Sequence, residues 1–476
     1  MEMNENPAAM LPELLLVLGA VIGLLAGSWL PRTRQWVVRL VAVAACLAGL
    51  VAAAVDLTRP AQEVFDGTYV VDAGLGAVRI VVLASVLLVI GLSVDGFAGS
   101  PRETELYVLL LLGGLGAITM AGANDLLLLV AAYLLASIPL YALTGIARTG
   151  SGTEAAMKYY LMGALSGVTM LVGATVLFGV GGSTQYADLA PALPGAPRAA
   201  VAVGLVALLA GLLFKIGAVP LHFWVPDVVQ GATTAVAAFV STVPKIGGLL
   251  ALHRLLTTAL PGSDVDWSAL VAVVAAVTMT LGNLGAFFQD DVRRLLGYST
   301  ISQVGYLLMA VAAAGRSALA LPALGLYLAA YAVTNLGAFA VAAALPHART
   351  PADYRGAATR HPWLALSLAV CLFGLVGTPP TAVFFGKLVV FGAAVDAGLA
   401  WLAVLAVVNT VASVFYYLRW IAPVFRRRPA GGEAGDSGTV VAGAGTWSTV
   451  SAHVAAVASV LLGITSGPVL ALVALP

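Results

Sequence analysis

The chain has 476 residues, of which 61% are hydrophobic and only 9% are charged, and its formal net charge is +1. A soluble domain carries roughly 25% charged residues, so these charges are too few to cover a core with a water-soluble surface. The near-neutral charge gives no basic footprint for nucleic acid. Cys46 and Cys371 lie in apolar runs, without the spacing of a disulfide or a metal site.

Apolar stretches follow one another along the whole chain. A transmembrane helix needs roughly 20 apolar residues. The stretch 363–398 is too long for one straight span and contains Pro379 and Pro380, which predicts an interruption. The sequence therefore predicts an all-α, polytopic membrane protein of about 14 transmembrane helices. The predicted spans are 9–30, 36–56, 74–97, 104–122, 124–147, 155–180, 199–224, 233–259, 267–288, 295–315, 318–345, 363–398, 400–424 and 450–474.

Basic residues concentrate in every second predicted loop, and the loops between them hold aspartates with few basic residues. Since short cytoplasmic loops carry the excess of Lys and Arg, both termini are expected outside. The acidic N-terminus lacks the basic region of a cleaved signal peptide, so the first helix is expected to be retained. A Gly-, Ala- and Ser-rich stretch at 429–445 is expected to be a flexible loop. The basic loops hold Arg32, Arg34, Arg39, Arg102, Arg148, Lys158, Arg293, Arg294, Arg349, Arg355, Arg360, Arg426, Arg427 and Arg428.

Lysine is rare in this chain, which has four lysines against nineteen arginines. Lysine can lose its proton when buried, whereas arginine stays charged. Lys215, Lys245 and Lys387 lie inside apolar spans, where a charge is costly and usually faces a cavity or a proton relay. The alternative is snorkelling of the long side chain to the interface. Snorkelling is favoured for Lys158, which lies near a helix start and close to Glu154.

Gly and Pro interrupt the apolar run beside two of these lysines. Pro220 follows Lys215, and Pro379 and Pro380 precede Lys387. Paired interrupted helices in two halves of a chain indicate an inverted-repeat transporter with a site near the midplane, while simple kinking is the alternative for either segment alone.

His222 follows the first interruption at a distance of two residues from Pro220. A histidine inside the membrane can relay protons near neutral pH. It can equally be a hydrogen-bonded residue near the cytoplasmic interface, and both interpretations stay open. The charged run at 290–294 is better explained by a solvated loop and a helix start than by a site.

Several blocks of the sequence resemble subunit N of bacterial NADH:quinone oxidoreductase, respiratory complex I. The resemblance covers most of the chain from the fourth to the thirteenth predicted helix. The blocks around Lys215 and Lys387 are quite specific to this subunit, whereas sister subunits L and M and cation/proton antiporter subunits share only the general pattern. The matching blocks are Lys158–Ser166, Phe214–Asp227, Arg293–Ser299, Asp353–Gly356, Gly377–Ala382 with Phe384–Lys387, and Tyr416–Arg419.

The resemblance implies two inverted five-helix, antiporter-like repeats with discontinuous helices 7 and 12. It implies N-terminal helices 1–3 at 1–103, a first repeat (helices 4–8) at 104–260, a second repeat (helices 9–13) at 261–428, and a loop with helix 14 at 429–476. It also implies that Lys215, Lys245 and Lys387 form a protonatable chain, and His222 joins them as a candidate for the proton path. The accessory candidates are Lys158, Glu154, Gln303, Pro220, Pro379 and Pro380.

The resemblance further implies that the chain is a non-redox translocase subunit, which moves protons while quinone is reduced elsewhere. No cofactor is expected in this chain, and quinone, flavin and iron–sulfur clusters are expected in partner subunits. The implied partners are the other membrane subunits, of the M, L, K, J, A and H types, and the lipid of a bacterial inner (plasma) membrane, with no nucleic acid.

The chain departs from the family at positions that usually titrate. Family members usually place in helix 5 a glutamate that pairs with the lysine of helix 7, and Leu134 occupies that position here. Gln230 stands where the family often has Glu, and Gln303 where it usually has His. Thr233 and Ala235 replace the usual prolines. These departures suggest a divergent second copy of subunit N with an altered or weakened first half-channel.

Two alternatives remain on the sequence alone. The chain could be a cation/proton antiporter subunit of the Mrp type, without a redox partner, or a structural membrane subunit that no longer pumps. The blocks Tyr159–Ala164 and Asp353–Gly356 favour subunit N over the antiporter. The missing carboxylate at Leu134 is the argument for the structural subunit.

Overall fold

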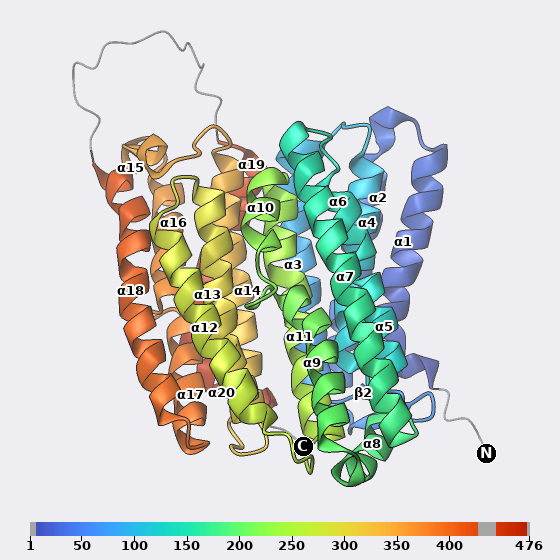
Figure 1. Cartoon of the computed structure of the whole chain (residues 1–476). Coiled ribbons are helices and arrows are strands. Elements are labelled where there is room, and N and C mark those ends of the chain that lie inside the picture. Colours follow the sequence, from blue (N-terminus) through green and yellow to red (C-terminus); the bar gives the residue numbers. More distant parts are fainter. Residues whose placement is uncertain (1–5, 427–443, 474–476) are drawn as a thin grey trace.

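The computed structural model describes residues 6–426 and 444–473, which cross one bundle repeatedly in long apolar helices (Figure 1). In this part of the chain, 13 helical segments have the length and composition to span a membrane. A further crossing is broken in the middle, into α16 (Pro362–Val376) and α17 (Ala382–Asp396). The predicted all-α, multi-pass membrane fold is thus confirmed, and the broken crossing completes the predicted set.

The helices follow the chain order of the predicted spans. The first part contains α1 (Leu11–Trp29), α2 (Trp36–Asp56), α3 (Ala73–Phe97), α4 (Glu103–Gly122), α5 (Leu126–Leu135), α6 (Ile138–Thr144), α7 (Gly150–Gly181), α9 (Arg198–Ile216), α10 (Trp224–Gly231) and α11 (Thr234–Arg254). The second part adds α12 (Trp267–Phe287), α13 (Val292–Ala313), α14 (Ala320–Ala344), α18 (Ala400–Phe425), α19 (Thr446–Ile464) and α20 (Ser466–Val473). Short elements complete the described chain: η1 (Pro7–Met10), η2 (Arg32–Arg34), β1 (Gln62–Val64), β2 (Tyr69–Val71), α8 (Tyr186–Ala192), η3 (Leu193–Gly195), the π-helix η4 (Leu255–Ala259), η5 (Pro351–Tyr354) and α15 (Ala357–Arg360).

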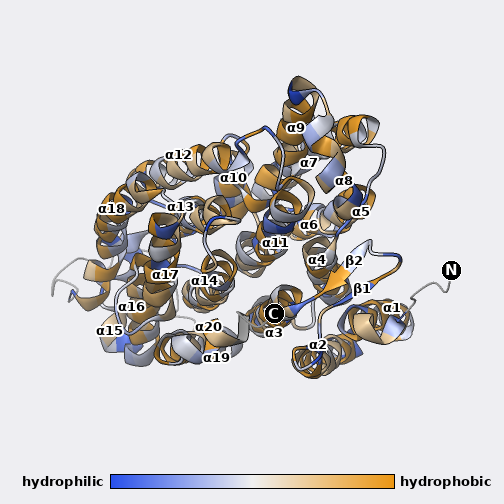
Figure 2. Ribbon diagram, turned by 90° about the horizontal axis from the view of Figure 1, so that it is seen from below, coloured by the Kyte–Doolittle hydropathy of each residue, from blue (hydrophilic) through white to orange (hydrophobic). Residues whose placement is uncertain are grey.

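Burial separates an inner group of helices from an outer group. In its most apolar stretch α11 is 100% buried, α13 94% and α14 83%, whereas α1, α7 and α18 are 39% buried and α2 is 33% buried. Seen along the bundle, α11 and α14 lie near the centre and α1 and α2 at one edge (Figure 2). Outer apolar faces suit contact with lipid, so polar side chains on the inner helices have to bond within the protein.

The central helix α11 packs closely against α4. A Cβ added at Gly247 would lie 2.1 Å from the carbonyl oxygen of Ala117 on α4, so only glycine permits this approach. Small residues at helix contacts are the usual means of close packing inside membranes. The contact fixes the part of α11 that carries Lys245.

The fifth predicted span is interrupted, which the sequence analysis did not predict. α5 ends at Leu135 and α6 begins at Ile138, with Ser137 in the turn between them. Pro139 has no amide hydrogen to donate to the carbonyl of Leu135, so the α-helical ladder cannot continue through it. The predicted single helix at 124–147 is therefore corrected to two short helices.

A two-stranded antiparallel hairpin was also missed in the loop before α3. β1 pairs with β2, so that Gln62 lies opposite Val71. Three-residue strands are too short to give a readable alternation of polar and apolar residues. The hairpin leads into α3, whose first turn is capped by Asp72 accepting from the amide of Leu75 at 2.8 Å.

A buried charge cluster ties the N-terminal helices to this hairpin. Arg79 of α3 is fully buried and contacts Glu13 of α1 at 2.8 Å and Asp56 of α2 at 3.1 Å. Tyr69 of β2 donates to Glu13 at 2.7 Å. Since an unpaired buried charge is strongly destabilising, this arrangement fixes α1, α2, α3 and the hairpin to one another. We call Arg79, Glu13, Asp56 and Tyr69 the Arg79 cluster.

Consecutive loops of the chain lie at opposite ends of the bundle. α15, with Arg360, lies at one end, and the hairpin and α8 lie at the opposite end (Figure 1). α1 begins and α20 lies at this second end. Arg427, Arg428 and residues 429–443 of the predicted loop lie outside the described residues. The side of the membrane that each end faces stays a prediction.

Candidate functional site

The first long interruption lies between α9 and α10. α9 ends at Ile216, and Gly217 follows with a φ of +76°, a left-handed conformation that suits a residue without Cβ. Because α10 begins only at Trp224, the carbonyl of Ile216 is left at a helix end without an amide partner from its own helix. Nζ of Lys245, on α11, donates to this oxygen at 3.0 Å.

The second interruption, between α16 and α17, repeats this geometry. α16 ends at Val376, and Gly377 follows with a φ of +92°. Nζ of Lys387, on α17, donates to the carbonyl of Val376 at 2.9 Å. The predicted discontinuity of helices 7 and 12 is thus present, and each break presents its last carbonyl to a buried lysine.

The two lysines with equivalent contacts at the breaks are not the two lysines whose sequence neighbourhoods are alike. Lys215 and Lys387 have similar neighbourhoods in the sequence, but Lys215 lies before its break and Lys387 lies after the other. The lysine that corresponds to Lys387 in its contact is Lys245, from the next helix. The acceptor of each amine therefore identifies the corresponding lysines better than their position along the chain does.

Lys215 has a different partner, on the interrupted fifth crossing. Its Nζ donates to the hydroxyl of Ser137, and it lies 4.8 Å from the centre of the Tyr133 ring. Leu134, at the position where the family usually has glutamate, is 46% exposed, while Ser137 is fully buried. Leu134 belongs to the exposed stripe of this crossing, with Leu127, Ala131 and Ile138, so the side chain that reaches Lys215 is that of Ser137.

The three amines share one kind of environment. The exposed fraction of the residue is 0% for Lys215 and Lys245 and 3% for Lys387. Each amine lies over an aromatic ring, with Lys245 5.2 Å from the centre of Trp224 and Lys387 4.2 Å from the centre of Tyr306. Their acceptors are neutral hydroxyl and carbonyl oxygens. Such acceptors hold an amine in place in either protonation state.

A polar layer on the inner helices lies between the two breaks. Tyr331 of α14 donates to the carbonyl of Ser241 on α11 at 2.7 Å and to the hydroxyl of Thr300 on α13 at 3.1 Å. Gln303 donates to the carbonyl of Leu375, beside the second break, at 2.8 Å, and accepts from Tyr327 at 2.5 Å. Gln303 thus lies where α13 meets the break of α16, as a neutral member of the layer.

A second polar group lies behind Lys387. Its amine contacts the hydroxyl of Thr410 at 3.4 Å, and Thr410 donates to Tyr306 at 3.3 Å. Asn283 of α12 donates to the side chain of Asn409 at 2.9 Å. The sequence analysis missed these residues. Asparagine inside an apolar span is the signal that could have found them, because such a residue must bond within the protein.

The prolines and His222 lie on the outer side of the breaks. Pro220, Pro379 and Pro380 are exposed on the bundle surface, so they interrupt the helices without lining the polar layer. His222 is only partly buried and its ring lies 4.4 Å from that of Phe223. The structure therefore brings Lys245 and Lys387 each onto a break, and places His222 at the edge of the first one.

A network of charged side chains lies at the end of the bundle that carries α15. Lys158 contacts Glu154 at 2.8 Å and Asp227 at 2.9 Å, and Arg294 contacts Asp227 at 2.7 Å. Gln230 accepts from Arg294 at 3.0 Å. These residues line an open cleft of about 590 Å³. Lys158 and Glu154 are thus surface residues of a cleft and do not join the buried lysines.

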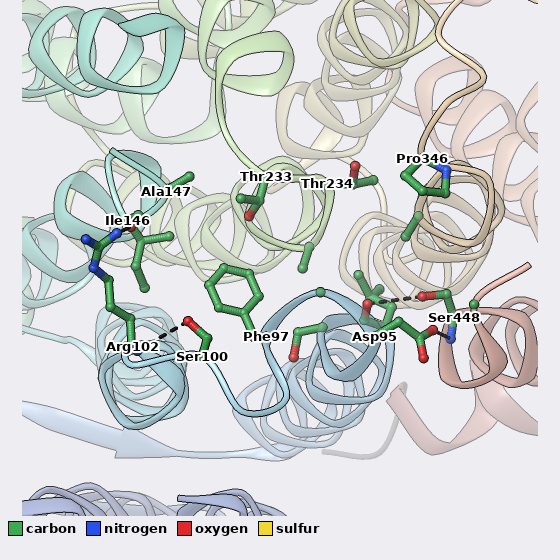
Figure 3. A pocket seen from close by; sticks show the side chains of 16 residues that line it. Asp95, Phe97, Ser100, Arg102, Ile146, Ala147, Thr233, Thr234, Pro346 and Ser448 are labelled. Carbon is green, nitrogen blue, oxygen red and sulfur yellow. Dashed lines mark hydrogen bonds between the residues drawn. The ribbon is translucent and has the colours of Figure 1, made fainter. Parts of the chain in front are cut away.

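A second cleft, of about 510 Å³, adjoins the first and shares Ala147 and Thr233 with it. Figure 3 shows its lining, with Phe97 facing Thr233 and Thr234 at the start of α11. Asp95 accepts from the amide of Ser448 at 2.7 Å and so caps α19. The two clefts together open the bundle end from which α11, with Lys245, descends into the core.

Comparison with known families agrees with this geometry. Residues 123–413 match the family described as NADH:quinone oxidoreductase/Mrp antiporter, transmembrane. The NADH-quinone oxidoreductase subunit N 1 of Streptomyces griseus subsp. griseus is 55% identical over 470 residues, covering 99% of this chain and 98% of that protein. Subunit N of a Mycobacterium species is 51% identical over 468 residues, covering 98% of each chain.

Solved structures give the same fold. A chain of respiratory complex I from Thermus thermophilus with bound aureothin is 32% identical, with a TM-score of 0.82 over 97% of this chain and 98% of that chain. A chain of the Mrp complex from a Dietzia species is 22% identical with a TM-score of 0.84 over 98% and 96%, and this likeness shows the fold alone. This chain therefore belongs to the NADH:quinone oxidoreductase/Mrp antiporter membrane family and, within it, to the subunit N group of NADH-quinone oxidoreductases.

Proposed function

We propose that this chain translocates protons through the membrane as subunit N of an NADH:quinone oxidoreductase, with Lys215, Lys245 and Lys387 as the groups that bind and release them. The observation that carries the proposal is the repeated geometry of the two breaks. In each, a buried lysine bonds a helix-end carbonyl, at 3.0 Å for Lys245 and 2.9 Å for Lys387.

The chemistry of these contacts suits proton exchange. A buried lysine can exist as a neutral amine, which arginine cannot. A carbonyl or hydroxyl oxygen accepts from the amine and demands no fixed positive charge. The hydroxyls of Tyr331 and Thr300, between α14 and α13, provide exchangeable protons on the way from Lys245 to Lys387. The cleft at the α15 end that Asp95, Thr233 and Thr234 line is the entry for protons from the water phase.

The energy for translocation comes from electron transfer in partner subunits, which in this proposal hold the quinone site, the flavin and the iron–sulfur clusters. This chain assembles with other subunits of the complex, in the proposal those of the M, L, K, J, A and H types. It lies in the bacterial inner membrane with both termini outside, so that the α15 end faces the cytoplasm. His222 is an accessory group at the first break.

The domain division follows from the two breaks. We place the first antiporter-like repeat at 104–260 and the second at 261–428, after N-terminal helices at 1–103 and before the last segment at 429–476. Each repeat then contains one of the two long interruptions, between α9 and α10 in the first and between α16 and α17 in the second.

The proposal is favoured over a Mrp-type antiporter by the two subunit N relatives above 50% identity. It is favoured over a purely structural subunit by the position of Leu134. That residue points outward, so the lack of a carboxylate there leaves the contact of Lys215 with Ser137 unaffected.

NADH-driven acidification of inverted membrane vesicles tests this function. Lys387→Ala is expected to abolish acidification while the assembled complex is retained. Lys158→Ala is the matched control, since it removes a lysine whose side chain is 47% exposed, and it is expected to pump as the native chain does. Unchanged acidification in Lys387→Ala, with the variant chain present in the complex, would refute the proposal.

A further inference from the structure

The partner of Lys215 is a hydroxyl in the turn of an interrupted helix. Ser137, between α5 and α6, is fully buried, and its oxygen accepts from the Lys215 amine. Ser137 in turn donates to the carbonyl of Tyr133 at 2.6 Å. A hydroxyl can rotate its proton between neighbouring acceptors. Ser137 can therefore turn its O–H from the Tyr133 carbonyl toward a neutral Lys215 amine.

The burial pattern of this crossing decides which side chain reaches this lysine. Exposed residues recur at helical spacing at Leu127, Ala131, Leu134 and Ile138, and buried ones at Tyr133, Ala136, Ser137 and Leu140. Leu134 is thus on the outer stripe, 46% exposed, and Ser137 on the inner one, fully buried. A carboxylate introduced at position 134 would accordingly point away from Lys215 in this backbone.

Resting on the function proposed above, we propose that Ser137 is the proton-exchanging partner of Lys215 in this chain. In one exchange, the O–H bond of Ser137 breaks and an N–H bond forms on the neutral amine. The Ser137 oxygen then takes a proton from a water molecule, which restores its O–H bond, so that one proton has moved from water to Lys215.

The test compares four variants in the assembled complex, by NADH-driven acidification of inverted vesicles at matched NADH oxidation. Ser137→Ala is expected to lower the acidification rate at least about a hundredfold, the low side of what a positioned acid–base group contributes. Ser137→Thr keeps a hydroxyl and is expected to pump, which a loss of packing alone would not explain.

Thr144→Ala is the matched control for a lost buried hydroxyl. Thr144 is fully buried on α6 and donates to the carbonyl of Leu140 at 2.8 Å, as Ser137 does to a carbonyl one turn earlier. Thr144→Ala is expected to pump normally. Leu134→Glu is also expected to leave pumping unchanged.

Native pumping by Ser137→Ala, together with loss in Lys387→Ala, would overturn the role of Ser137 and leave the proposed function standing. Recovery of a defective Ser137→Ala chain by Leu134→Glu would overturn it too, because a carboxylate at 134 would then reach Lys215. Native pumping by both Ser137→Ala and Lys387→Ala would refute the proposed function itself.

Discussion

The Arg79 cluster and the three buried lysines, Lys215, Lys245 and Lys387, place positive charge inside an apolar protein beside opposite kinds of acceptor. Arg79 is fully buried against two carboxylates, Glu13 at 2.8 Å and Asp56 at 3.1 Å. Lys245 and Lys387 are equally buried, but their acceptors are backbone carbonyls.

The difference follows from the chemistry of the two side chains. Arginine keeps its proton, so its charge has to be compensated permanently by carboxylates. Lysine can give its proton away, and neutral oxygens then suffice. The first arrangement holds N-terminal helices together, and the second leaves an amine free to exchange. The comparison thus separates a structural charge from a functional one.

The largest effect is expected from removing the arginine. Arg79→Met leaves Glu13 buried without a counter-charge, while Asp56 keeps its ion pair with Arg59 at 3.2 Å. Breaking a buried pair in this way costs on the order of 3–5 kcal/mol of folding stability. The expected result is little or no variant chain in the membrane, measured by quantitative immunoblot against a partner subunit. Adding Glu13→Gln to Arg79→Met removes one uncompensated charge and is expected to recover part of the chain. Native levels of Arg79→Met would contradict the structural role of the cluster.

Removing a buried lysine is expected to give the opposite pattern. Lys245→Met keeps an unbranched side chain of similar length, and no partner carboxylate is left behind at Ile216. We expect a normal amount of assembled chain and loss of NADH-driven acidification. The same immunoblot and the vesicle assay measure both quantities. A missing chain, as for Arg79→Met, would mean that the lysine charge is structural.

A smaller effect is expected from the polar layer between the breaks. Tyr331→Phe removes the hydroxyl that bonds Thr300 at 3.1 Å but keeps the ring. We expect a slowing of proton pumping by about tenfold or less, since water can replace part of the link, with assembly unchanged. Tyr107→Phe is a suitable control, because Tyr107 is a fully buried phenol outside the layer. Equal pumping by both variants would remove Tyr331 from the path.

The smallest effect is expected at the charged network around Asp227. Lys158 is half-exposed and contacts Glu154 at 2.8 Å. Exposed ion pairs contribute about 0–1 kcal/mol, so Lys158→Ala is expected to change neither assembly nor pumping by more than a small fraction. The pumping rate at low and high salt checks this, because a proton-path lysine would show a large loss at both.

Much of the fold was predictable, because long apolar runs and the Gly–Pro interruptions are signals within single segments. The breaks at Gly217 and Gly377 were visible in this way. The site was predicted only in part: the three lysines stand out as rare charges, but their partners depend on backbone directions. Ser137 reaches Lys215 from the buried face of its crossing, and the sequence alone did not show that Leu134 lies on the exposed face. The Arg79 cluster was missed because Glu13 and Asp56 lie 66 and 23 positions from Arg79 in the sequence.

Proton exchange at the buried lysines is tested most directly by the acidification rate of inverted vesicles with Lys245→Arg. Arginine keeps the positive charge and the donor to the Ile216 carbonyl, but it cannot release a proton. We expect an assembled complex that no longer pumps through this chain. Native acidification with arginine at this position would show that a fixed charge is sufficient, and would contradict proton exchange at the buried lysines.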